Sequence, residues 1–244
     1  MGAKPLILGH RGASDAAPEN TLAAFQAGLD VGVDGFELDV QLSSDGELVV
    51  IHDERVDRTT SGKGWVKDMT LAELKKLDAG SWFNPKFAGE RIPTLGEVLE
   101  LVAESCALIN VEIKSGVVLY PGIEAKIISL LKKFRAIDKT VLSSFNHFSL
   151  RTAKVIDPAV KTGVLYMEGL VDPWVYAKQV PADALHPAFY AVVPEIVKGA
   201  HAAGLTVNTW TVDKPDDMRR MIACGVDAVI TNCPKVMLDI VKEE

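Results

Sequence analysis

The sequence has few of the features that mark several large classes of protein. Its three cysteines, Cys106, Cys224 and Cys233, have a spacing that fits neither a zinc site nor a disulfide framework. No apolar run approaches the roughly 18 residues that cross a bilayer, and the amino-terminal segment has no signal-peptide core. We therefore expect a cytoplasmic protein with reduced thiols and no stable membrane association.

Positive charge is also scarce. The chain has 33 acidic and 26 basic residues, a formal net charge of -7, and no lysine- or arginine-rich run longer than a pair. Nucleic-acid binding needs a basic patch, so it is not expected. A glycine-rich dinucleotide loop is missing as well. The 244 residues, 48% of them hydrophobic, are still enough for one large core or two small ones.

Short apolar runs alternate with amphipathic stretches along the whole chain. The runs that predict strands are 6–9, 35–40, 48–52, 108–113, 141–144, 162–166, 184–186, 206–210 and 228–231. Strands that alternate with helices indicate parallel βαβ units. About eight such units at this length favour a TIM (β/α)8 barrel over an open doubly wound sheet. We expect one catalytic domain over residues 1–244.

Helix starts are marked by residues that cap a helix. Thr70 and Thr94 each precede a glutamate by three residues, a pattern that predicts a capping box. Asn20 is the expected N-cap of the first helix.

Residues 54–93 interrupt the alternation. They contain turn residues, one short helix and the aromatic residues Trp65, Trp82, Phe83 and Phe87. Ordinary βα loops have about 2–6 residues, so this segment is an insertion after the second barrel strand region. It could be a solvent-facing decoration. We expect a small cap over the active-site face, packed by its own aromatic residues.

Carboxylates alternate with apolar residues in two of the predicted strands. Glu37 and Asp39 share one side of the run 35–40, and Glu112 lies in the run 108–113 between Asn110 and Lys114. In an edge strand this pattern would be an ordinary wet face, and Glu112 could simply pair with Lys114. In a barrel the polar side faces the interior, where like charges need a cation. Three carboxylates without histidine or cysteine favour calcium or magnesium.

Two histidines occupy the same kind of position, each at the end of an apolar run. His10, followed by Arg11, ends the first run, and His52 ends the third. A lone histidine is commonly structural, but two at the carboxyl ends of barrel strands are good candidates for acid–base catalysis. Arg11 suits phosphate oxygens. The remaining histidines, His147, His186 and His201, are weaker candidates, although His186 could line the mouth.

Trp210 closes the seventh barrel strand. It is either a packing residue or an apolar wall for the organic part of a substrate.

Taken together, these residues resemble the glycerophosphodiester phosphodiesterase family, most closely its bacterial cytosolic members. The motifs that carry the resemblance run in order along nearly the whole chain: His10-Arg11-Gly12, Pro18-Glu19-Asn20-Thr21, Glu37-Leu38-Asp39-Val40, His52-Asp53, Asp57-Arg58-Thr59-Thr60, Gly80-Ser81-Trp82-Phe83, Ile92-Pro93-Thr94-Leu95, Glu112-Ile113-Lys114 and Trp210-Thr211-Val212. One departure is Asn232, where the family usually has aspartate. We expect that change to alter the rim after the last strand and not the core chemistry.

The resemblance implies a metal-dependent hydrolase. Its substrate would be a small glycerophosphodiester, and its products an alcohol and sn-glycerol 3-phosphate. A divalent cation, Ca²⁺ or Mg²⁺ with Mn²⁺ as a further candidate, would be bound by Glu37, Asp39 and Glu112. His10 and His52 would be the acid–base pair.

The resemblance also assigns the residues around the phosphate. Arg11 and Lys114 would lie near it, and Glu19 matches a family position close to the site, behind these residues. The attacking group would be water or the neighbouring glycerol hydroxyl through a cyclic phosphate, and the family favours the second route.

Two other functions remain as alternatives. A phosphodiesterase acting on intact lipids would need an apolar or basic rim, for which the sequence shows no clear candidate beyond Trp82 and Phe83. A phosphate binder without activity would lack His10 or His52, and both are present.

Overall fold

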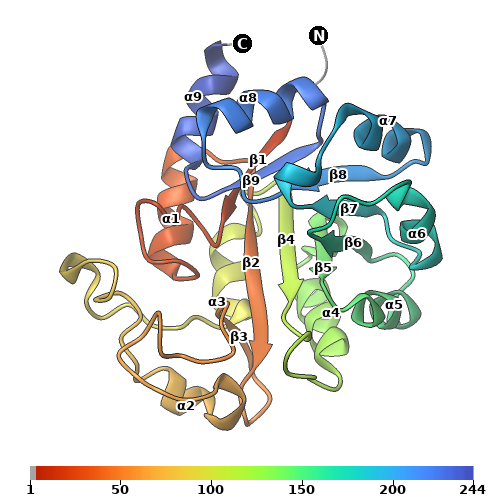
Figure 1. Cartoon of the computed structure of the whole chain (residues 1–244). Coiled ribbons are helices and arrows are strands. Elements are labelled where there is room, and N and C mark those ends of the chain that lie inside the picture. The colour runs from red at the N-terminus through yellow and green to blue at the C-terminus, as the bar shows by residue number, and fades with distance from the viewer. Residues whose placement is uncertain (1–3, 244) are drawn as a thin grey trace.

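The predicted strands all form, and eight of them pair in parallel to close a ring. A computed structural model describes residues 4–243 of the chain. Pairing of β1 with both β2 and β9 closes the barrel (Figure 1). The ring strands are β1 Leu6–His10, β2 Gly35–Leu42, β4 Leu108–Ile113, β5 Thr140–Ser144, β6 Lys161–Tyr166, β7 Ala184–Pro187, β8 Thr206–Thr209 and β9 Ala228–Thr231. The predicted TIM barrel is confirmed.

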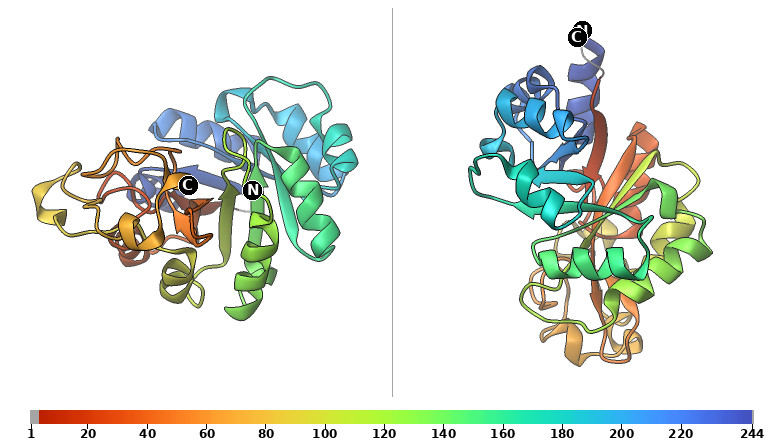
Figure 2. Two further views of the ribbon diagram at one scale, coloured as in Figure 1. Left: turned by 90° about the horizontal axis from the view of Figure 1, so that it is seen from below. Right: turned by 90° about the vertical axis from the view of Figure 1, so that its right-hand side faces the viewer.

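Helices follow the ring strands and cover the outside of the barrel (Figure 2). They are α1 Leu22–Val31, α3 Leu95–Val102, α4 Ile123–Lys133, α5 His147–Ile156, α6 Pro173–Gln179, α7 Pro194–Ala202, α8 Pro215–Cys224 and α9 Pro234–Glu243. Between residues 4 and 243, no helix combines the length and the apolar character that a membrane crossing needs.

The helix caps largely follow the prediction. Both capping boxes form, at Thr70 before α2 (Leu71–Leu74) and at Thr94 before α3. The prediction for Asn20 is wrong, because Thr21 caps α1. Asn20 instead has a positive φ of 57°. Its side-chain amide points into the barrel and donates a hydrogen bond to the carboxylate of Asp39.

The third apolar run is not a barrel strand, which corrects a second prediction. It forms β3, Leu48–Val50, which pairs antiparallel with β2 outside the ring. The chain reverses after β2 at Asp45-Gly46, where Gly46 has a φ of 80° that suits glycine. An Asp-Gly pair between two apolar runs is a strong hairpin signal. His52 therefore lies two residues beyond a hairpin strand and does not end a barrel strand.

The segment after β3 has a small core of its own, but that core is aliphatic. Its buried members are Val49, Ile51, Val56, Val66, Leu74, Ala79 and Ile92. The aromatic rings of Trp82, Phe83 and Phe87 contact each other edge to face, yet Trp82 is 40% exposed. Trp82, Phe83 and Phe87 thus pack against one another as expected, but the buried core of the segment is formed by aliphatic residues.

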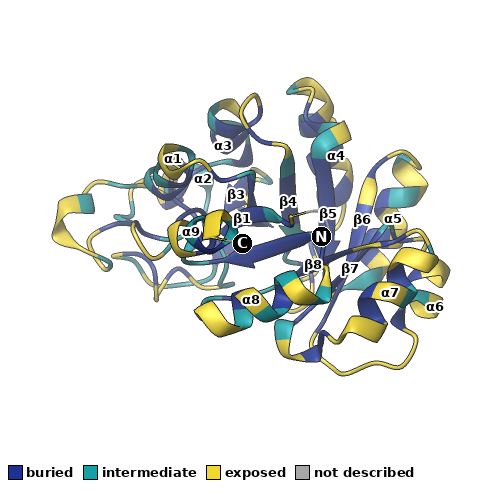
Figure 3. Ribbon diagram, turned by 90° about the horizontal axis from the view of Figure 1, so that it is seen from above, coloured by how far each residue is buried: buried dark blue, intermediate teal, exposed yellow. Residues whose placement is uncertain are grey.

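The two ends of the barrel interior differ in polarity. Along β1 the inward side chains change from Leu6 and Leu8 to His10, because alternate residues share one face of a strand. Leu8 packs with Ala228 and Ile230 in an apolar plug. Figure 3 shows the strands as buried and the outer helix faces as exposed. Polar groups inside the barrel are therefore concentrated towards the carboxyl ends of the strands.

His186 is buried inside the barrel rather than at its mouth. Its side chain is 0% exposed, and Gly163 leaves the space that the ring occupies. Nε2 of His186 lies 3.0 Å from the amide of Asn208, which donates to it. Burial lowers the pKa of His186 to about 3. The imidazole is therefore neutral in the folded protein at neutral pH.

This burial predicts an acid-sensitive fold. The folded-state pKa of His186 lies below its ordinary value of 6.5, so its contribution to stability is complete above that value and is lost as the pH falls towards 3. We expect the free energy of unfolding to drop by on the order of a few kcal/mol over this window. Urea unfolding at a series of pH values should show a shallower drop for His186→Gln, and an identical drop would contradict the prediction.

Candidate active site

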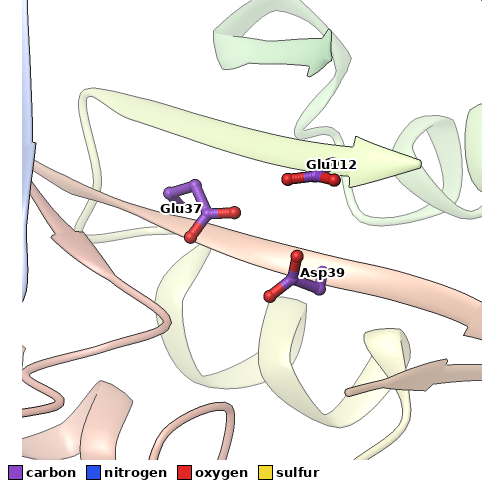
Figure 4. A group of neighbouring side chains, drawn as sticks. All are labelled: Glu37, Asp39 and Glu112. Atoms are coloured by element: carbon purple, nitrogen blue, oxygen red, sulfur yellow. The ribbon is translucent and has the colours of Figure 1, made fainter. Parts of the chain in front are cut away.

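Three carboxylates from two neighbouring strands face one another. The register of β2 and β4 sets Asp39 beside Glu112, and Glu37 is two residues earlier on the same side of β2. One oxygen from each carboxylate lies within 4.8 Å of the others. Figure 4 shows all three groups turned towards the same space between the strands. The structure thus brings together the three predicted metal ligands.

Burial makes this arrangement electrostatically costly. Burial and the charge of Asp39 raise the pKa of Glu37 well above its ordinary value, and the same two causes raise the pKa of Glu112. Burial would raise the pKa of Asp39 as well, but Arg11 and Lys114 outweigh it and hold that pKa below the ordinary range. Asp39 is therefore the most firmly ionised member of the cluster.

The donor set fits a hard divalent cation. All three groups offer oxygen, which is what calcium and magnesium prefer. The Oδ1 atom of Asp39 is buried and has no hydrogen-bond partner among the described residues. Its other oxygen, Oδ2, accepts a hydrogen bond of 2.9 Å from the amide of Asn20, which orients the carboxylate. An acceptor of this kind is left open for a cation.

Two positively charged side chains, those of Arg11 and Lys114, flank the carboxylates. Arg11 Nε lies 3.2 Å from Asp39 Oδ2, and Lys114 Nζ lies 2.9 Å from Glu112 Oε1. The ion pair between Glu112 and Lys114, which was the alternative to a metal-ligand role for Glu112, is therefore present beside the carboxylate cluster. Glu19 accepts a hydrogen bond of 2.7 Å from Arg11 and two more from Arg58, so it lies behind Arg11.

His10 and His52 line the same cavity of about 70 Å³, with Arg11, Glu37 and Glu112. Nε2 of His10 lies 3.7 Å from Glu37 Oε2. Burial, followed by the charge of Arg11, lowers the pKa of His10 to about 4. The two predicted histidines therefore meet, although only His10 ends a ring strand.

The loop that carries His52 is held from inside the barrel. Gln41 lies on the inward side of β2. Its side-chain amide donates hydrogen bonds to the backbone carbonyls of Ile51, His52 and Asp53 at 3.0, 3.0 and 2.7 Å. The ring of His52 contacts Asp53 through Nδ1 at 2.7 Å, and Arg58 holds Asp53 in turn. These contacts place His52 at the cavity without a barrel strand.

The other side of the cavity is apolar. Phe145, Leu165 and Trp210 line it. The indole of Trp210 donates to the carbonyl of His186 at 2.8 Å, and its ring lies 5.6 Å from that of Phe145. Trp210 thus makes packing contacts and also lines the cavity, and its role as a wall for the substrate stays a prediction.

Asn232 contacts His10 directly. This contact corrects the expectation that Asn232 alters only the rim after the last barrel strand. Its Oδ1 lies 2.7 Å from Nδ1 of His10, and its amide donates to Asp213 at 2.7 Å. Because the amide hydrogens face Asp213, the oxygen is left to accept from His10. Asn232 therefore orients the ring of His10.

Sequence reasoning overlooked three further residues of the site. Asn20 was assigned to a helix cap, Phe145 was not considered, and Asn110 was noted only as a polar neighbour. Asn110 lines the cavity with its buried Oδ1 unpartnered. The alternation in the strand 108–113 was the signal that could have included Asn110.

The volume of a cavity does not by itself identify the functional site. A larger groove of about 510 Å³ lies at the surface between the β2–β3 turn and α4, and it contains none of the predicted residues. The chemistry of the smaller cavity is what distinguishes it.

The fold and these residues together define a TIM-barrel hydrolase with its site at the carboxyl ends of the strands. The family model described as glycerophosphoryl diester phosphodiesterase matches residues 10–236. The chain belongs to this family, and it is a phosphodiesterase.

The names of similar proteins agree with this assignment. A glycerophosphodiester phosphodiesterase from Caldanaerobacter subterraneus subsp. tengcongensis is 53% identical over 240 residues, which is 98% of this chain and 99% of the relative. One from Bacillus subtilis is 37% identical over 94% of this chain and 84% of the relative. An Oleispira antarctica phosphodiesterase, solved in complex with the product sn-glycerol-3-phosphate, has a TM-score of 0.90 and 32% identity over 98% of this chain and 97% of that one.

The contact between Asn232 and His10 gives a testable prediction. Asn232→Leu removes the partner of Nδ1, so we expect kcat on a glycerophosphodiester to fall at least about tenfold with little change in KM. Asn232→Asp keeps an acceptor and should retain more activity than the leucine variant. Nitrogen chemical shifts of the His10 ring should change in the leucine variant. Wild-type kcat and shifts in Asn232→Leu would contradict the positioning role.

Proposed function

We propose that the protein hydrolyses glycerophosphodiesters to an alcohol and sn-glycerol 3-phosphate with the help of a divalent cation. The observation that carries this proposal is a cavity lined by His10, His52, Glu37 and Glu112, with the buried carboxylate of Asp39 beside Glu37 and Glu112. The product complex of the Oleispira antarctica relative supports the same substrate class.

Glu37, Asp39 and Glu112 are the proposed cation ligands. Their oxygen-only chemistry favours Ca²⁺ or Mg²⁺, and Mn²⁺ is a further candidate. A bound divalent cation would supply charge neutralisation for the anionic phosphate. The unpartnered oxygen of Asp39 supports this role.

Arg11 and Lys114 are proposed to hold the phosphate beside these ligands. Both already pair with the carboxylates, at 3.2 Å from Asp39 and 2.9 Å from Glu112, so their charges are directed at the cavity. Positive groups held in place before the reaction stabilise charge that develops in the transition state. Glu19 keeps Arg11 in this position through its 2.7 Å contact.

His10 and His52 are proposed as the acid–base pair. One histidine takes a proton from the attacking oxygen, and the other gives a proton to the leaving alkoxide. With Nδ1 of His10 held by Asn232, Nε2 is the atom available to the substrate. The attacking oxygen belongs to water or to the neighbouring glycerol hydroxyl, and the net products are the same.

The surroundings of the cavity complete the proposal. Trp210 contacts the organic part of the substrate. The segment 54–93 caps the adjoining side of the active-site face, supported by the contacts of Arg58 with Glu19 and Asp53. A cytoplasmic location is supported by three unpaired cysteines.

Incubation with glycerophosphocholine or glycerophosphoethanolamine tests the function. We expect release of glycerol 3-phosphate with Mg²⁺, Ca²⁺ or Mn²⁺ and loss of that release after chelation, restored by adding the cation back. No release with any of these cations would overturn the enzymatic proposal. Activity that survives thorough chelation would overturn the cation proposal alone.

Replacement of the histidines tests the acid–base pair. His10→Ala and His52→Ala should each lower kcat by on the order of 10²-fold or more. Exposed His201→Ala is the matched control and should keep wild-type turnover. Wild-type rates in either cavity variant would remove that histidine from the mechanism.

A further inference from the structure

Arg58, which belongs to the insertion, connects two carboxylates beside the cavity. Its Nη1 and Nη2 atoms donate to Glu19 at 2.7 and 2.9 Å, and its Nε and Nη2 atoms donate to Asp53 at 2.7 and 2.9 Å. A guanidinium group is planar and carries five N–H donors, so it can hold two carboxylates at once in this paired manner. Glu19 precedes β2 in the chain and Asp53 follows β3, and Arg58 fixes their separation in space.

Each of the two carboxylates contacts a different residue of the proposed site. Glu19 accepts a hydrogen bond of 2.7 Å from Nη1 of Arg11, and Asp53 lies 2.7 Å from Nδ1 of His52. Arg11 and His52 line the cavity, whereas Arg58 does not. The contacts therefore run from one side chain of the insertion to a proposed phosphate-holding residue and to a proposed acid–base residue.

The charge of Arg58 keeps both partners ionised. Its hydrogen bonds are the main reason that the pKa of Asp53 is lowered to about 2. Burial would raise the pKa of Glu19, but hydrogen bonds from Arg58 and the charge of Arg11 outweigh it and lower that pKa. An anionic Asp53 can only accept a hydrogen bond, so it fixes the proton of the His52 ring on Nδ1 and leaves Nε2 for the substrate.

The turn that carries Arg58 is anchored in the insertion. Val56 is fully buried in the core of this segment, and its N–H donates to the carbonyl of Gly64 at 3.0 Å. The hydroxyl of Thr60 donates to the carbonyl of Val56 at 2.7 Å, which closes the turn around Arg58. In Figure 1 the insertion lies next to the loop between β1 and α1, and the ion pair of Arg58 with Glu19 joins the two segments. The backbone of Arg58 is thus held in place, while its side chain is 45% exposed.

We propose that Arg58 is a positioning residue for the reaction, which sets Arg11 through Glu19 and His52 through Asp53. This inference rests on the proposed function and gives the insertion a part in it, although no residue of 54–93 lines the cavity. One side chain would then align the group that holds the phosphate with a group that transfers a proton. Such alignment matters because a small displacement of reacting groups costs on the order of 10²-fold in rate.

Substitution of Arg58 tests the inference with glycerophosphocholine as substrate. Arg58→Ala should lower kcat/KM by on the order of 10- to 100-fold, with a lower kcat and a higher KM, because the contacts to both carboxylates are lost. Arg58→Lys keeps the charge but offers one nitrogen to two carboxylates, so it should recover part of the loss. Arg55→Ala is the matched control and should keep wild-type values, because Arg55 lies in the same segment, is 47% exposed and pairs with Asp57.

Chemical rescue distinguishes positioning from folding. Because the side chain is exposed, free guanidinium, well below the concentration that unfolds the protein, should restore part of the kcat of Arg58→Ala. Sodium chloride at the same ionic strength should not. A wild-type kcat/KM in Arg58→Ala, or a loss that merely follows a lowered Tm, would overturn the inference.

A triple variant identifies the route by which Arg58 acts. Added to the double variant Glu19→Gln, Asp53→Asn, the change Arg58→Ala should cost little more, because its two partners no longer carry the charges that it holds. A further loss as large as in the wild-type background would overturn the positioning role, since Arg58 would then act on the substrate directly.

The nitrogen chemical shifts of the His52 ring separate the inference from the proposed function, because they need no turnover. They should change in Arg58→Ala and keep wild-type values in Arg55→Ala, even if no glycerophosphodiester is hydrolysed. Unchanged His52 shifts in Arg58→Ala would overturn the inference whatever the activity. A wild-type protein that hydrolyses none of these diesters would overturn the proposed function alone.

Discussion

Repulsion among the carboxylates of Glu37, Asp39 and Glu112, the first two buried and the third only slightly exposed, is the constraint on which the rest of the site depends. Glu37 is 4% exposed and Asp39 is fully buried, so water does little to screen them. Each neighbouring group offsets part of this repulsion: Arg11 and Lys114 by charge, Asn20 by a hydrogen bond. The Oδ1 atom of Asp39 accepts no hydrogen bond from the described residues, although Lys114 Nζ lies 3.8 Å away, so this oxygen can still take a cation as a ligand.

The parallel barrel makes such a cluster achievable. Pairing of β1, β2 and β4 sets His10 beside Glu37 and Asp39 beside Glu112, because strands in register align residues of the same face. The apolar plug of Leu8, Ala228 and Ile230 fills the opposite end. Apolar side chains therefore fill the barrel at the amino ends of the strands, and the site residues lie at the carboxyl ends, which is the usual division in this fold.

The catalytic face is divided in a second way. The polar side combines Glu19, Asp53 and Arg58 around His52, and the apolar side consists of Trp210, Phe145 and Leu165. A ligand with a charged phosphate and an uncharged organic part matches this division, since each part meets surface of its own kind.

Local pattern was enough to predict much of the fold and the central residues. Periods of two in 35–40 and 108–113 revealed Glu37, Asp39 and Glu112, and the alternation of runs predicted the ring. The strand β3 was predicted but its direction was not, although the Asp45-Gly46 pair before it is a signal for an antiparallel hairpin. What the sequence alone determined is which residues alternate. The contact of His10 with Asn232, 222 positions away, and the contact of Phe145 with Trp210 were decided by the tertiary structure, because closure of the barrel brings together residues that no local pattern relates.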